Sequence, residues 1–103
     1  MVSYLVLAKI IDQELFQEYL KGHLPTMAAY GGRVIFRSTD NTTVLGTDSW
    51  DAIALQQWPD STSFERWWHS EEYRPWAGIR DKAARITIIS MAGIEELDAC
   101  TDT

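Results

Sequence analysis

The sequence has few residues of the kinds that several large functional classes require. It contains one cysteine, Cys100, so no disulfide can form within the chain, which is typical of proteins from a reducing compartment. Its 103 residues include nine Lys and Arg against fifteen Asp and Glu, for a net charge of −6, and the basic residues are scattered. Nucleic acids and anionic membranes bind basic stripes or clusters, so we expect neither as a partner.

Membrane, secretory and cofactor-binding signals are also absent from the sequence. No apolar run approaches the ~20 residues of a membrane-spanning helix, and the N-terminus lacks the basic and apolar segments of a secretory signal. We therefore expect a cytoplasmic protein. No glycine-rich loop opens a helix, and one cysteine with two histidines cannot build a structural zinc site. The sequence suggests neither a cofactor nor a metal.

The residues that are present predict alternating strands and helices. Apolar residues make up 46% of the chain, as in globular domains. Continuous or alternating apolar residues predict strands at 4–10, 33–37, 43–45, 50–58 and 86–91. Apolar residues at helical spacing predict helices from Asp12 to about 30, over 62–69, and over 71–84 with Ser70 as its cap. Pro25 is expected to kink the first helix or to divide it in two.

This order of elements is that of the ferredoxin-like, split β-α-β fold, an α+β class in which helices cover one face of an antiparallel sheet. We predict a single domain over residues 1–93 and an acidic, flexible tail at 94–103. The strands are apolar on both faces, so the face without helices has to be buried against another surface. A second copy of the chain is the simplest cover, and we predict a homodimer joined through its sheets.

Several short motifs occur in a recognisable order between about residues 3 and 92. They are Tyr4-Leu5-Val6, Glu18-Tyr19 through Pro25, Tyr30-Gly31-Gly32-Arg33, Trp58-Pro59-Asp60, and Ser70-Glu71-Glu72-Tyr73-Arg74-Pro75 running to Arg80. Together they resemble a family of small bacterial proteins with the dimeric α/β-barrel fold, catalogued as a domain of unknown function. Trp68, Trp76 and the acidic tail depart from that family's pattern. The resemblance implies the fold and the dimer, whereas the wider superfamily includes monooxygenases, haem-degrading enzymes, isomerases and dehydratases.

Three residues are candidates for catalysis. Arg80 falls on the apolar face of its predicted helix, where a guanidinium must be paired, reach water or anchor a carboxylate or enolate ligand. His23 lies among apolar side chains of the first helix, either as a satisfied core residue or as a proton-transfer group. Tyr73 either donates a hydrogen bond to a ligand carbonyl or fills the core.

The candidates for ligand binding are mainly aromatic. Trp67 and Trp68 are adjacent on a helix and point about 100° apart, so one of them can line a pocket for a flat, apolar ligand while the other packs in the core. His69 is alternatively a residue that interacts with a helix dipole, and Arg37 is alternatively a surface residue. The full candidate set is Arg37, Trp50, Trp67, Trp68, His69 and Trp76.

Two classes of function follow from these residues. The first is a cofactor-free enzyme that acts on a flat or aromatic carbonyl or enolate compound by proton transfer or oxidation, with Arg80 and Tyr73 holding an oxyanion and His23 moving a proton. The second is a non-catalytic dimer that binds a metabolite or a protein partner. An Arg80 side chain closed onto an acidic residue, with no cavity beside His23, would favour the second class.

Overall fold

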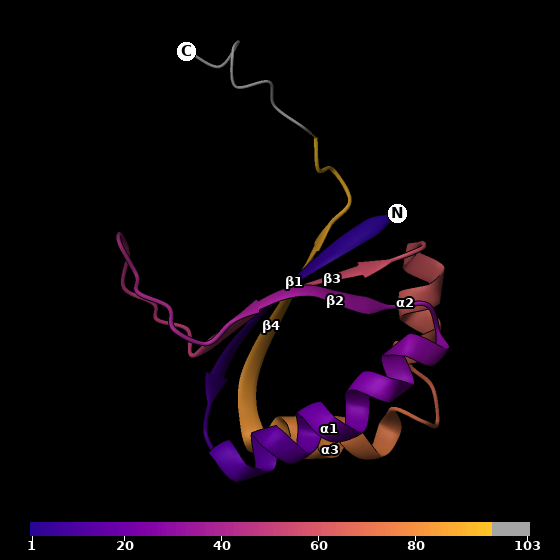
Figure 1. Ribbon diagram of the computed structural model, residues 1–103, viewed down its shortest axis with the longest axis horizontal. Coiled ribbons are helices and arrows are strands. Elements are labelled where there is room, and N and C mark those ends of the chain that lie inside the picture. Colours follow the sequence, from indigo (N-terminus) through magenta and orange to yellow (C-terminus); the bar gives the residue numbers. More distant parts are fainter. Residues whose placement is uncertain (96–103) are drawn as a thin grey trace.

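The computed structural model describes residues 1–95 as a four-stranded antiparallel sheet with three helices on one of its faces (Figure 1). Neighbouring strands lie in the order β2-β3-β1-β4, and all three pairings are antiparallel. The α+β, ferredoxin-like arrangement is therefore confirmed. In chain order, the elements are β1 (Val2–Ile10), α1 (Gln13–Ala29), β2 (Arg33–Ser38), β3 (Ala52–Trp58), α2 (Ser61–Trp68), α3 (Arg74–Ala83) and β4 (Ala84–Met91).

The helix α1 runs without a break through Pro25, so its expected division into two helices is wrong. It begins where the Asp12 carboxylate accepts a hydrogen bond from the Leu15 N–H. Pro25 removes one backbone hydrogen-bond donor, which disfavours the helix locally. Burial of one side of α1 against the sheet stabilises the helix by more than this loss. The helix is followed by Gly31, whose φ of 90° suits glycine.

The helix α3 begins at Arg74, three residues later than its pattern predicted. A turn over residues 71–73 precedes it, and Ser70 stabilises this turn from both sides. The Ser70 hydroxyl donates to the Trp67 carbonyl and accepts from the Tyr73 N–H. Pro75 lies in the first turn of α3, where the missing N–H has no helical partner to lose.

No strand forms at 43–45 in the described part of the chain. Instead, residues 39–51 form a loop that projects from the body of the molecule between β2 and β3 (Figure 1). Val44 and Leu45 at its tip are 96% and 95% exposed, so no packing supports an extended pair there. The Asn41 side-chain amide closes the base of the loop by donating to the Ser38 and Trp50 carbonyls.

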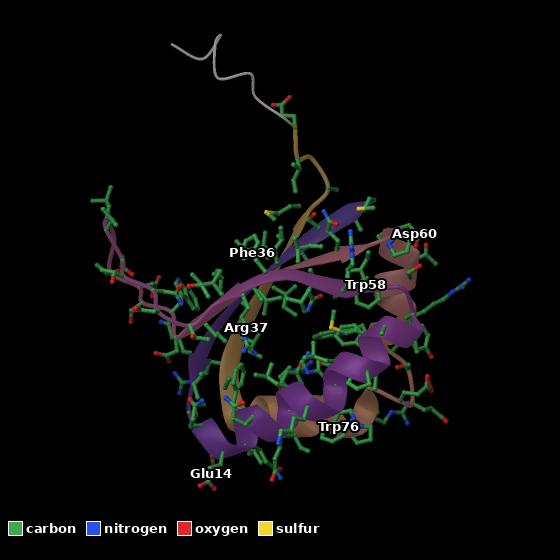
Figure 2. All side chains as sticks on the ribbon, viewed as in Figure 1. Glu14, Phe36, Arg37, Trp58, Asp60 and Trp76 are labelled. Atoms are coloured by element: carbon green, nitrogen blue, oxygen red, sulfur yellow. The ribbon has the colours of Figure 1, made fainter. Side chains whose placement is uncertain are left out.

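The core lies between the sheet and the helices and is rich in aromatic rings. Tyr4 of β1 stacks on Phe64 of α2 with 4.0 Å between the ring centroids, and Trp58 and Trp67 are almost fully buried. A glycine in α1 allows Trp76 of α3 to lie directly against that helix, because a Cβ at Gly22 would overlap the Trp76 ring (Figure 2).

The other face of the sheet is apolar and has no cover among residues 1–95. The strand register places Leu5 of β1 between Leu55 of β3 and Ile89 of β4, and Phe36 of β2 beside Leu55. Phe36 is 51% exposed and Ile89 is 44% exposed. Both faces are thus apolar, as the sequence indicated.

Two further expectations concern the termini and membranes. Within residues 1–95, no helix is both long enough and apolar enough to span a bilayer. From residue 96 onward, the acidic tail and Cys100 lie outside the residues that the structure describes.

Candidate functional site

A cavity of about 300 Å³ lies between α1 and the inner face of the sheet. Its volume is at the lower end of the range of ~300–1,000 Å³ found for small-molecule sites. Small side chains of the sheet leave room for this cavity. Ala8 of β1 is paired with Ala52 of β3, and Ala54 follows on the same face of β3. Most of the other lining side chains are apolar, among them Phe16, Leu20, Leu24, Val34, Ile86 and Ile88.

His23 is a neutral imidazole in the wall of this cavity. Its Nδ1 lies 2.7 Å from the Tyr19 carbonyl oxygen, which can only accept, so the proton is on Nδ1 and Nε2 is an acceptor. Burial lowers the pKa of His23 from 6.5 to about 4, although the hydrogen bond to Tyr19 opposes this shift. The residue is 4% exposed, and its ring stacks on the Tyr19 ring with 3.9 Å between the centroids.

The Nε2 atom of His23 has no hydrogen-bond partner among residues 1–95. Every fully buried side-chain nitrogen and oxygen in that range does have a partner, so Nε2 is accessible. Since His23 lines the cavity, we assign Nε2 to the cavity surface. It is therefore a free hydrogen-bond or proton acceptor for a bound molecule.

Gln56 is a second polar group in the cavity, and the sequence interpretation missed it. The residue is 6% exposed, and its Oε1 accepts from the Trp58 indole N–H at 3.1 Å. The amide nitrogen thus remains available to donate to a ligand. The signal was present in the sequence, because Gln56 occupies the same face of its strand as Ala52, Ala54 and Trp58.

Arg37 stands where this cavity adjoins a second one of about 530 Å³, and it lines both. It projects from β2 toward the helices, on the side opposite Phe36 (Figure 2). An irregularity between Val34 and Phe36 shifts the alternation of β2 and turns Arg37 inward. The guanidinium forms no ion pair or hydrogen bond with the described residues. Trp50 lines the second cavity as well.

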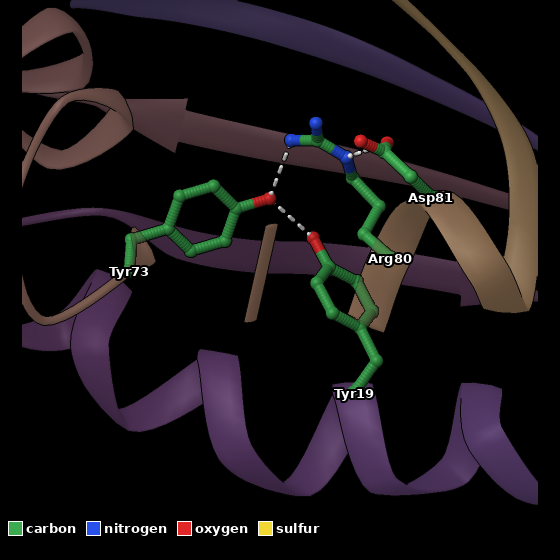
Figure 3. Close-up of polar contacts among 4 residues, drawn as sticks. All are labelled: Tyr19, Tyr73, Arg80 and Asp81. Atoms are coloured by element: carbon green, nitrogen blue, oxygen red, sulfur yellow. Dashed lines mark hydrogen bonds and ion pairs between the residues drawn. The ribbon is translucent and has the colours of Figure 1, made fainter. Parts of the chain in front are cut away.

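Arg80 belongs to a hydrogen-bond network that adjoins the cavity without lining it (Figure 3). Its Nε donates to Asp81 Oδ1 and its Nη1 donates to the Tyr73 hydroxyl, each at 3.0 Å. The Tyr73 and Tyr19 hydroxyls lie 2.7 Å apart, and burial raises the pKa of both, so they share a hydrogen bond as neutral phenols. The guanidinium also lies 4.6 Å from the Trp68 ring centroid.

The remaining predicted site residues are spread over different surroundings. Trp67 lines the His23 cavity, and its indole N–H donates to the Thr26 hydroxyl at 2.9 Å. Trp76 packs against Gly22 and lines neither cavity. His69 is exposed and lies 3.4 Å from the Glu65 carboxylate. The structure thus brings Arg37 and Trp67 together with His23 in the first cavity. Arg80 and Trp68 instead line a separate cavity of about 270 Å³.

Metal-ligating side chains do not gather anywhere in the described range of 1–95: no three His, Cys, Asp or Glu residues are close enough to hold one ion.

Solved structures with the same fold come from bacteria and a plant. RPA0582, a protein of unknown function from Rhodopseudomonas palustris, is 17% identical with a TM-score of 0.82, over 92% of this chain and 83% of that one. At3g17210 from Arabidopsis thaliana is 13% identical with a TM-score of 0.75, over 94% and 99%. SnoaB from Streptomyces nogalater, described as a cofactor-independent oxygenase, is 13% identical with a TM-score of 0.66, over 93% and 95%. At such identities the likeness establishes the fold alone.

Sequence comparison identifies the family but not an activity. No functionally curated protein matches the sequence. The model of the family described as a domain of unknown function (DUF1330) matches residues 3–94, and the chain belongs to this family.

Proposed function

We propose that the protein is a cofactor-free enzyme that binds a flat, largely apolar carbonyl or phenolic compound in the cavity beneath α1 and moves a proton with His23. The observation that supports this most directly is the free Nε2 of a buried, neutral histidine in an otherwise apolar cavity. Neutral imidazole is the form that can accept a proton.

In the proposed step, Nε2 removes a proton from a carbon next to the ligand carbonyl, or from a phenol. The electron pair of the broken bond remains on the ligand as an enolate or phenolate, and the Gln56 amide donates a hydrogen bond to its oxygen. A His23 pKa of about 4 makes the empty site weakly basic, with a burial cost of roughly 3 kcal/mol. An anion about 4 Å away offsets this by about 4 kcal/mol at an effective dielectric of about 20. Charge formed on the ligand thus compensates charge formed on His23.

Tyr73 and Arg80 enter this proposal through Tyr19. Arg80 is already closed onto Asp81 and Tyr73, and neither Tyr73 nor Arg80 lines the cavity. Their hydrogen bonds orient the Tyr19 ring, on which the His23 imidazole stacks. We therefore propose that they position His23, in place of the direct oxyanion contact that the sequence suggested.

Oxidation is the form of chemistry that the likeness to SnoaB favours, because that protein is described as a cofactor-independent oxygenase. Removal of a proton creates an electron-rich enolate or phenolate, and dioxygen would be the co-reactant that accepts its electrons. Proton removal by His23 comes first in this sequence of steps, so it can be tested without dioxygen.

The test is exchange of the α-protons of 2-tetralone, a flat bicyclic ketone, in D₂O followed by NMR. Wild-type protein is expected to accelerate exchange, and His23→Gln to lose about 10²–10⁴-fold of that acceleration because glutamine keeps a hydrogen-bonding group but accepts no proton. His69→Gln, which replaces the exposed histidine, is the matched control and should retain the wild-type rate. Equal rates for wild type and His23→Gln would refute the role of His23. Binding of 2-tetralone by calorimetry without any exchange would favour the non-catalytic alternative.

We also propose that two copies pair through the outer face of the sheet. The supporting observation is the uncovered apolar surface around Leu55, including the half-exposed Phe36 and Ile89. In sedimentation experiments the wild type is expected at twice its mass of 11.8 kDa. Phe36→Asp should give a folded monomer, whereas Ile11→Asp, at an exposed position outside the sheet, should remain dimeric. A wild-type monomer at micromolar concentration would contradict this assembly.

A further inference from the structure

The cavity of His23 adjoins a polar cavity that has no assigned role. This second cavity lies between the start of α1 and the 39–51 loop and is lined by Gln13, Gln17, Asn41 and Trp50 among others. Three residues line both cavities: Phe16, Leu20 and Arg37. The boundary between an apolar and a polar compartment therefore contains one positive charge, that of Arg37.

Arg37 lines both cavities and, within the described residues, has its donors free, unlike Arg80 and Arg33. Arg80 is held by Asp81 and Tyr73, and Arg33 donates to the Gln57 side chain. Arg37 has no such partner among residues 1–95, although its position on β2 is fixed by pairing with Ala54. A guanidinium presents a planar set of donors that matches a carboxylate at two points.

The acidic residues of the outer cavity do not occupy the Arg37 donors. Asp40 and Asp51 line the cavity, but neither forms an ion pair with Arg37. The Asp51 carboxylate instead accepts from the Ile10 N–H at 2.8 Å. An anionic group in the polar cavity can therefore accept hydrogen bonds from Arg37. An apolar group can pack in the first cavity, on the other side of Phe16 and Leu20.

We propose that the ligand is an amphipathic acid, with a flat apolar body in the His23 cavity and a carboxylate bound to Arg37 where the two cavities meet. This inference rests on the proposed function, since it takes the His23 cavity as the ligand site. Beyond that function, it specifies that the ligand is negatively charged and how the ligand is oriented. The carboxylate lies at the boundary between the cavities, and the apolar body lies among His23, Gln56 and Trp67.

The test compares 2-naphthoate with 2-naphthamide, which have the same ring system and differ in charge, by calorimetric titration. Wild-type protein is expected to bind 2-naphthoate about tenfold more tightly than 2-naphthamide, as for a partly exposed charged hydrogen bond. Arg37→Met should abolish this preference by weakening 2-naphthoate alone, with 2-naphthamide unchanged within about twofold. Arg37 and Arg66 are both exposed residues, but Arg66 in α2 lines neither cavity, so Arg66→Met should leave both affinities unchanged.

The outcomes separate this inference from the proposal on which it rests. Equal binding of the two probes to the wild type, or full retention of 2-naphthoate affinity by Arg37→Met, would overturn the role of Arg37 and leave the cavity as a ligand site. Ala54→Leu fills the floor of the inner cavity and is expected to weaken both probes. If neither probe binds to the wild type, or if Ala54→Leu affects neither, the ring system does not occupy the His23 cavity and both proposals fail.

Discussion

Acidification is expected to destabilise the protein through His23, whose imidazole is kept neutral by burial. The pKa of His23 is about 4 in the folded protein, against 6.5 for an unburied histidine, as in the unfolded chain. Between these two values the unfolded state binds more protons than the folded state, so the free energy of unfolding decreases as the pH falls. The loss begins near pH 6.5 and is complete below about pH 4, where both states are protonated.

The size of this effect follows from the two pKa values. Their difference corresponds to roughly 3 kcal/mol when fully expressed, and about 2 kcal/mol is already lost at pH 5. A typical domain has a free energy of unfolding of about 5–15 kcal/mol, so the loss from this single side chain is readily measurable.

The assay is urea denaturation at about pH 8 and pH 5 for the wild type, His23→Gln and His69→Gln. Protein concentration and ionic strength are held constant, because dimerisation would make the apparent stability depend on concentration. All three proteins have the same carboxylates, so the contribution of these groups to the pH dependence of stability cancels in the comparison. The wild type and His69→Gln are expected to lose about 2 kcal/mol more than His23→Gln between the two pH values.

A His23→Gln protein whose stability falls in parallel with that of the wild type would refute this reasoning. It would mean that His23 becomes protonated in the folded protein as easily as in the unfolded chain. The description of Nε2 as a neutral acceptor kept so by burial would then be wrong.

Three further substitutions test the packing of Trp76 and the hydrogen bond between Tyr73 and Tyr19. Gly22→Ala places a methyl group in the Trp76 ring and is expected to cost about 1–3 kcal/mol in thermal unfolding, whereas Gly78→Ala, with open space around it, should stabilise α3 by up to about 1 kcal/mol. If the two alanines behave alike, Trp76 does not lie against α1. Tyr73→Phe should cost about 1–3 kcal/mol in urea denaturation, because it leaves the buried Tyr19 hydroxyl without its partner. An unchanged midpoint would show that this hydrogen bond does not form.

Most of the fold could be predicted because the signals are local. Asp12 and Asp60 precede their helices and accept hydrogen bonds from the Leu15 and Ser63 N–H groups, as expected of helix caps. Apolar spacing likewise identified the order of strands and helices, and hence the α+β class. These features depend on residues a few positions apart in the chain.

The errors arose where distant packing overrides local preference. Pro25 stays inside one helix because α1 is buried along its length on Phe16, Tyr19 and Met27. The apolar residues at 43–45 form no strand because nothing in the described structure lies close enough to pair with them. Neither outcome is encoded within the few residues concerned.

The candidate site was predictable only in part. The sequence singled out His23 as a polar residue among apolar neighbours, and it lines the cavity. Gln56 stood in a comparable position on β3 and was overlooked. For Arg80, the sequence left an ion pair and a ligand anchor open, and the structure shows the ion pair with Asp81.

By itself, the sequence determined the three helices, the four strands that form, their order and the apolar character of both sheet faces, since helix caps and apolar periodicity act over a few residues. Only the tertiary structure decided which polar groups share a cavity. Alanines on two strands face each other through the strand register, and an irregularity in β2 turns Arg37 inward and Phe36 outward. Strict alternation from Val34 would have placed them the other way round. A shift of one residue in pairing reverses every side chain beyond it, and that shift is set by contacts between strands.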